Sequence, residues 1–192
     1  MNLRLCLYNE PILRQKGKPV ETFDQSLKDL AMEMAVLMEE ENGIGIAAQQ
    51  VGLDRQFCVV DVRGAEEAFL CEIDGKPQPP DLVMPLYLAN PEIAKNSSTK
   101  TVFEEGCLSL PEIRGEVERP GEIEIRYQDL NGNSHQLRAD GILARCIQHE
   151  VDHLNGVLFI DHLSSAELKK QEKKLKRLRR ETRDFLKQQK NF

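Results

Sequence analysis

Hydrophobic residues recur at helical spacing in residues 25–41. The spacing predicts an amphipathic helix, with Asp24 or Ser26 as its N-terminal cap and Asn42-Gly43 as its end. We expect the methionines at apolar positions of this helix to fill the core. The periodic positions are Leu27, Leu30, Ala31, Met34, Leu37 and Met38.

Strand patterns follow this segment. The run FCVVDV, which begins at Phe57, is short and apolar, as expected of a buried strand. Residues 115–140 alternate apolar and polar side chains on both sides of Asn131-Gly132, a dipeptide typical of a hairpin turn. Residues 63–81 are rich in charge, glycine and proline, so we expect a long loop there.

A second helix is predicted from Asp140, with Gly156 as its C-terminal stop. A strand and a C-terminal helix are expected after it. The order of elements is then helix, several strands, helix, strand and helix. Such an order favours an α+β fold built on antiparallel sheet.

Charge divides the chain into two parts. Residues 166–192 contain eleven basic and four acidic residues, a net charge of +7, so the total of −6 leaves −13 on residues 1–165. We therefore expect one domain at 1–165 and a basic C-terminal helix at 166–192. The overall charge gives no reason to expect DNA binding. The basic helix has one apolar stripe, formed by Leu168, Leu175, Leu178 and Phe185. An ordinary solvated helix that docks on the domain through this stripe is therefore an alternative interpretation.

The N-terminal residues lack a signal-peptide core, and no apolar run approaches the roughly eighteen residues that a membrane span requires. The five cysteines are irregularly spaced and odd in number, which argues against a disulfide framework. We expect a cytoplasmic protein without a membrane partner.

The stretch QHEVDHLNG, residues 148–156, carries candidate chemistry. At about 100° per residue, Cys146, His149, Glu150 and His153 share one face of the predicted helix. Two imidazoles at i and i+4 can bind one metal ion, with Glu150 beside them to move protons. Three buried ionisable groups would be costly without a metal or partners.

A catalytic metal needs a third protein ligand and an open position. The extended pattern HExxHxxGxxH is excluded because Phe159 stands at its third-ligand position. Glu167 or Glu172 would be the ligand of a metallopeptidase, although both lie in the lysine-rich tail. The remaining candidate is Cys107 in EEGCLSLP, whose thiolate would complete a His, His, Cys set.

A third stretch, GIGIAAQQVG, places small residues where a peptide backbone could approach closely. The amide of Gln50 could donate to a developing oxyanion. Taken together, GIGIAAQQ, EGCLS and QHEVDH in this order resemble peptide deformylase, over about residues 11–163. The resemblance implies an α+β fold with antiparallel sheets packed around a central metal-binding helix.

The resemblance also implies a function: removal of the N-formyl group from the N-terminal methionine of newly synthesised polypeptides. It implies Cys107, His149 and His153 as metal ligands, Glu150 as acid and base, and Gln50 with the Leu108 N–H as oxyanion hole. Hydroxide on the metal would attack the formyl carbonyl. The expected ion is Fe²⁺, one per chain, with Zn²⁺, Ni²⁺ or Co²⁺ as substitutes.

Further expectations concern the substrate and the surroundings of the site. A formylmethionyl peptide would pair with Gly43, Ile44 and Gly45 as an added strand, with Cys146 beside its methionine side chain. We expect Glu105 and Arg119 to pair and hold the cysteine loop, and Asp152 to orient a ligand. Similar bacterial enzymes imply that the basic helix touches the ribosome near the exit of the nascent chain. The long loop leaves substrate preference beyond formyl-methionine open.

Two other functions remain open at this stage. A metallopeptidase with Glu167 or Glu172 as ligand would not need Cys107. A structural zinc module could close a tetrahedral site with Cys107, Cys146, His149 and His153. The second possibility would leave Glu150 and Gln50 without a role.

Overall fold

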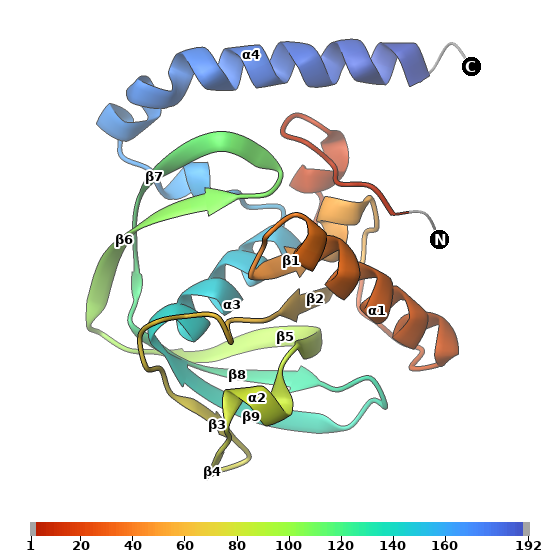
Figure 1. The fold of residues 1–192 in the computed structure, drawn as a ribbon, viewed down its shortest axis with the longest axis vertical. Coiled ribbons are helices and arrows are strands. Elements are labelled where there is room, and N and C mark those ends of the chain that lie inside the picture. The colour runs from red at the N-terminus through yellow and green to blue at the C-terminus, as the bar shows by residue number, and fades with distance from the viewer. Residues whose placement is uncertain (1–2, 190–192) are drawn as a thin grey trace.

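The computed structural model describes residues 3–189 and has two antiparallel sheets with helices around them (Figure 1). The larger sheet has seven strands in the order β1-β2-β5-β8-β9-β3-β4, and the smaller one pairs β6 with β7. The strands are β1 (Gly45–Ala47), β2 (Phe57–Val60), β3 (Cys71–Ile73), β4 (Lys76–Pro77), β5 (Leu86–Asn96), β6 (Lys100–Cys107), β7 (Leu110–Pro120), β8 (Glu122–Gln128) and β9 (Ser134–Asp140). The helices are α1 (Gln25–Glu40), α2 (Pro80–Val83), α3 (Gly141–Leu154) and α4 (Ser165–Gln189), with 3₁₀ turns η1 (Pro11–Arg14), η2 (Ala48–Val51) and η3 (Phe159–His162).

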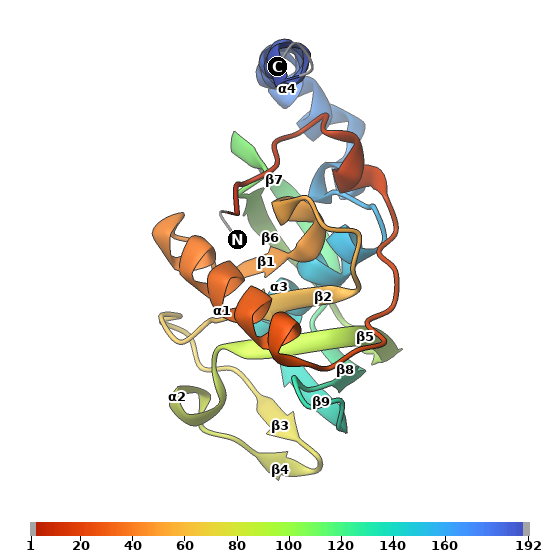
Figure 2. The same cartoon turned by 90° about the vertical axis from the view of Figure 1, so that its right-hand side faces the viewer.

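The centre of the large sheet is covered on both faces. Successive side chains of a strand point to opposite faces, and in β2 Phe57 and Val59 pack with α1, whereas Cys58 and Val60 pack with α3. Figure 2 shows α1 and α3 on opposite sides of β1 and β2. This double coverage explains why FCVV is a continuous apolar run and not an alternating one.

The predicted elements at the core are confirmed. Helix α1 begins after Asp24, whose carboxylate accepts hydrogen bonds from the N–H groups of Ser26 and Leu27. Its Met34 and Met38 are buried, as expected. Strands β8 and β9 pair along their whole length, and their connection contains Gly132 at φ +83°, a left-handed conformation that glycine adopts without strain.

The small sheet joins the cysteine stretch to the C-terminal helix. Buried side chains of β7 pack with the segment after α3 and with Leu178 of α4; these β7 residues are Leu110, Ile113 and Val117. In Figure 1, α4 crosses above the β6–β7 hairpin and extends past it. The hairpin therefore lies between α3 and the basic tail.

Two expectations were wrong. Residues 63–81 do not form a structureless loop, because Cys71–Ile73 pairs with β9 and Lys76–Pro77 returns beside it. These strands are too short to show alternation, and pairing with a distant strand stabilises them. The strand expected between the last two helices is the 3₁₀ turn Phe159–His162, whose apolar run fills the core beneath β7. Among the described residues, no helix is long and apolar enough to cross a membrane.

Candidate active site

Helix α3 carries the paired histidines. It begins after Asp140 and ends before Gly156, which has φ +74° and leaves no room for a Cβ because the carbonyl of Arg14 lies 2.6 Å from that position. Buried Leu143, Ile147 and Val151 hold the helix against the large sheet. His149 and His153 consequently contact the small sheet, at Glu105 and Cys107, whereas Glu150 faces Gly45 of β1.

Cys107 reaches this face from the end of β6. The pairing of β6 with β7 is regular up to Gly106 and then shifts register, so that Cys107 lies opposite Leu110. A bulge of this kind redirects the side chain that follows it. The Sγ atom of Cys107 lies 3.2 Å from Nε2 of His153. One donor atom from each of Cys107, His149 and His153 lies within 4.8 Å of the others.

This donor set fits a metal ion such as zinc or ferrous iron, since one thiolate and two imidazoles leave a fourth position of a tetrahedron open. Nδ1 of His149 donates to Glu105 at 3.0 Å, which leaves Nε2 for the ion. The pKa of His153 lies well below its ordinary value because the ring is buried. A neutral imidazole is the form that binds a metal.

Glu150 lies beside the donor set with 3% of its surface exposed. Burial raises the pKa of its carboxyl to about 7. Its Oε2 atom has no hydrogen-bond partner among residues 3–189. Gly45 faces this carboxyl, and a Cβ there would collide with Glu150 and come within 2.7 Å of the Cys146 sulfur. The second glycine of GIGIAAQQ is therefore required by the packing of the site.

Gln50 has a fixed orientation. Its Oε1 atom accepts a hydrogen bond from the Ala47 N–H at 2.8 Å, so its NH₂ group faces the cysteine stretch. That group lies 3.5 Å from Cys107 Sγ and 3.2 Å from Ser109 Oγ. The arrangement places an amide donor beside the metal donors, where an oxyanion could accept from it. Ser109, which is fully buried, was not singled out from the sequence.

A cleft of about 550 Å³ opens over these groups. All the predicted substrate-binding residues line it, together with Gln50, Leu108 and Glu150. Ile44 is 46% exposed, so its apolar side chain is available to a ligand. Cys146 Sγ donates to the carbonyl of Ile44 at 3.2 Å and is not among the clustered donors. The closed four-ligand zinc site therefore does not form in the described part of the chain.

The glutamates of the metallopeptidase alternative are also remote from the site. On α4, Glu167 pairs with Lys170 and Glu172 pairs with Lys176. Neither belongs to the donor group found among residues 3–189. Phe159, which excluded the longer protease pattern, stacks on His149 with 6.1 Å between ring centroids.

A buried charge network surrounds the donors. Arg119 Nε donates to Glu105 Oε1 at 2.7 Å, which confirms the expected pair, and Arg119 also bonds Asp152 at 2.7 Å. Burial opposes ionisation of Glu105, but hydrogen bonds from His149 and Arg119 hold its pKa well below the ordinary value. The Asp152 side chain bonds Arg119 and His162 and not a proposed ligand, so its hydrogen-bond path to His149 runs through Arg119 and Glu105. Arg145 joins the network and was missed, although its place one turn before His149 on an apolar helix face is a signal.

Comparison with known proteins agrees with this geometry. The sequence profile of the family described as Polypeptide deformylase matches residues 2–169. The chain belongs to the peptide deformylase family. The peptide deformylase of Opitutus terrae is 56% identical over 164 residues, 85% of each chain. That of Methylacidiphilum infernorum is 43% identical over 180 residues, 94% of each. A peptide deformylase structure from Plasmodium falciparum matches with a TM-score of 0.81 at 35% identity, covering 94% of this chain and 98% of that one.

Membership of the peptide deformylase family identifies the chain as a hydrolase that acts on a formyl amide. Its reaction is removal of the N-formyl group from nascent peptides, a step of protein biosynthesis. The expected α+β fold with antiparallel sheets and a C-terminal helix is confirmed by the structure and by its structural relatives. The family depends on a metal, and the Cys, His, His group is a possible site for it.

Proposed function

We propose that this chain deformylates peptides at a metal held by Cys107, His149 and His153, with Glu150 as the group that moves protons. The proposal rests on one observation: three donor atoms from two distant segments lie within 4.8 Å of one another beside a buried carboxyl. A thiolate with two imidazoles is a donor set suited to Fe²⁺, our proposed ion, and Zn²⁺, Ni²⁺ or Co²⁺ could replace it.

A divalent ion held there would supply Lewis acidity, which would make a water more acidic and polarise the formyl oxygen. Glu150 accepts the proton of the attacking water and returns it to the leaving amine. A pKa of about 7 makes both the acid and the base form of this carboxyl accessible near neutral pH. The Gln50 NH₂ group and the Leu108 N–H donate to the developing oxyanion, each contributing about 3 kcal/mol to the barrier reduction.

The substrate would bind as an extended strand. β1 lies at one edge of the seven-stranded sheet, so we propose that a peptide pairs with this edge at Gly45 and at Gly43 and Ile44, which immediately precede the strand. The exposed side chain of Ile44 and the buried thiol of Cys146 support a methionine pocket in the same cleft. Because Gly45 packs against Glu150, a peptide paired with this edge would have its formyl group close to the metal donors.

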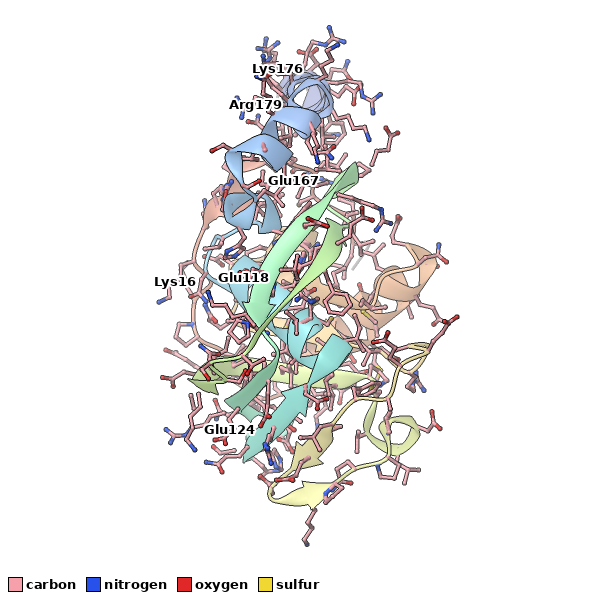
Figure 3. All side chains as sticks on the ribbon, turned by 90° about the vertical axis from the view of Figure 1, so that its left-hand side faces the viewer. Lys16, Glu118, Glu124, Glu167, Lys176 and Arg179 are labelled. Atoms are coloured by element: carbon pink, nitrogen blue, oxygen red, sulfur yellow. The ribbon has the colours of Figure 1, made fainter. Side chains whose placement is uncertain are left out.

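We also propose that residues 1–165 form the catalytic domain and that residues 166–192 bind the ribosome. Figure 3 shows side chains projecting from α4 on several sides of the helix, with Lys176 and Arg179 labelled. Most basic residues of α4 are exposed, which supports contact with ribosomal RNA near the nascent-chain exit. Five free cysteines, one of them a proposed ligand, support a reducing cytoplasmic location.

The test is formate release by protein purified without oxygen and loaded with Fe²⁺. Formyl-Met-Ala-Ser should release formate, and acetyl-Met-Ala-Ser should release almost no acetate, because we propose that the space at the carbonyl carbon accepts a hydrogen and little more. Both products are measured under the same conditions. Comparable rates on the two peptides would contradict a site built for the formyl group.

A further inference from the structure

Arg145 has no part in the steps above, yet it is one of the most buried charged residues of the chain. It lies on α3, 7% exposed, one turn before His149, and it lines the wall of the cleft. A buried guanidinium costs several kcal/mol unless its donors are paired. The partners of Arg145 therefore indicate what it does.

Within residues 3–189, every side-chain hydrogen bond of Arg145 goes to the β6–β7 hairpin. Nη1 donates to Glu105 Oε1 at 2.7 Å and to the carbonyl of Val117 at 3.1 Å. Nη2 donates to the carbonyl of Thr101 at 2.8 Å and to its hydroxyl at 3.1 Å. The guanidinium also lies 4.9 Å from the ring centroid of Phe103. Arg145 thus joins α3, which carries two proposed ligands, to the hairpin, which carries the third.

The contact with Glu105 leads directly to a ligand. Oε1 of Glu105 accepts from Arg119 and Arg145, each at 2.7 Å, while Oε2 accepts from Arg119 and from His149 Nδ1, each at 3.0 Å. Two arginines therefore hold both oxygens of the carboxylate in place. The hydrogen bond to Nδ1 in turn sets the ring angle and tautomer of His149, so that Nε2 faces Cys107.

The arginines and carboxylates of the network are equal in number. Arg119 and Arg145 are the two cations, and Glu105 and Asp152 are the two carboxylates. Loss of Arg145 would leave Glu105 with fewer donors and free to turn away from His149. It would also release the hairpin from α3 at the level of Thr101.

We propose that Arg145 is a positioning residue for the metal site: through Glu105 and Thr101 it fixes the His149 ring and the separation between α3 and the cysteine-bearing hairpin. This inference rests on the proposed function, since it requires Cys107, His149 and His153 to bind the ion. A merely structural role would change the stability of the protein and leave the affinity of the folded protein for the ion unchanged.

The experiment measures Zn²⁺ affinity of the metal-free full-length chain by competition with a chelator. Loss of a partner that orients a ligand typically weakens metal binding by about 10–100-fold, and we expect this loss for Arg145→Met. Arg145→Lys keeps the charge and should recover part of the affinity. Arg138→Met is the matched control, because Arg138 pairs with Glu122 at the exposed surface of β9 and should leave the affinity unchanged.

Urea unfolding of each metal-free variant shows which are folded. If Arg145→Met does not fold, the Zn²⁺ affinities of Thr101→Val and Arg145→Lys are compared with that of the wild type. Thr101→Val removes only the hydroxyl that accepts a hydrogen bond from Arg145. Unchanged Zn²⁺ affinity in the folded variants, with normal binding by the wild type, would overturn the role of Arg145 alone. A wild-type chain that binds no Zn²⁺ would overturn the proposed metal site and this inference together.

Discussion

Glu150 is a buried carboxyl whose burial costs stability. Its pKa rises from 4.5 to about 7 in the folded chain because it is desolvated. A carboxyl with a raised pKa lowers the stability of the fold at pH values where the unfolded chain would ionise it. The loss of stability is absent below the unfolded pKa of 4.5, grows as the pH rises from there and is complete above about pH 7. At 1.36 kcal/mol per pKa unit, the full cost is about 3 kcal/mol.

Glu150→Gln should therefore stabilise the metal-free protein at about pH 8, by up to about 3 kcal/mol, and the gain should shrink as the pH falls toward 5. Urea unfolding of both proteins at the two pH values measures it. Glu116→Gln, at an exposed position of β7, is the control and should show little gain at either pH. Equal stability of Glu150→Gln and wild type at the higher pH would show that burial of this carboxyl does not lower the stability of the fold.

Residues of the site differ in how far the sequence could predict them. His149, Glu150 and His153 were predictable because helical geometry alone places them on one face. Arg145 was on the same helix and was missed, because its partners Thr101 and Glu105 lie 44 and 40 residues away. The role of a buried arginine depends on such partners, which spacing does not reveal.

Among the elements, α4 has two faces with different neighbours. Leu178 and Thr182 are buried, and Lys174 and Arg177 bond Glu112 of β7, so part of the tail is docked on the domain. Cutting the tail would therefore expose apolar surface as well as remove charge. Lys173 and Arg180 are exposed, which offers a way to change charge without disturbing the docked face.

Lys173→Glu with Arg180→Glu should leave the melting temperature and the tripeptide rate close to wild type. Ribosome co-sedimentation should weaken, and in the wild type it should weaken steeply with salt, because contacts with phosphates release counterions. Lys16→Glu with Lys76→Glu changes the same charge on the domain surface and serves as control. Equal loss of ribosome binding in both pairs would mean that net charge, and not α4, is responsible.

The elements were predictable where local pattern and burial agree. Helix α1, strand β2 and the β8–β9 hairpin each carry a strong local pattern, and each was found as expected. Strand β3 was missed because its pairing with β9, more than 60 residues away, outweighs the loop-like composition of residues 63–81, and β4 was missed with it because β4 pairs with β3. The 3₁₀ turn at Phe159–His162 was missed because its apolar residues pack in the core beneath β7, and such a short apolar run looks the same in sequence as a buried strand.

At the scale of the whole molecule, the site exists because two sheets meet across α3. The large sheet supplies the glycine-rich edge, the small sheet supplies Cys107, and the helix between them supplies both histidines. Residue spacing indicated the helix face, whereas Cys107 was one of several candidates for the third ligand until the resemblance of three motifs favoured it. No local pattern fixes such a meeting of segments more than 40 residues apart.

The central claim is that Cys107, and no other cysteine, completes the metal site. Co²⁺ substitution tests it most directly, because a thiolate ligand gives cobalt an intense near-ultraviolet charge-transfer band. The account predicts the band in wild type and in Cys146→Ser, since Cys146 bonds the Ile44 carbonyl, and its loss in Cys107→Ser with weaker Co²⁺ binding. Retention of the band in folded Cys107→Ser, or its loss in folded Cys146→Ser, would contradict the account.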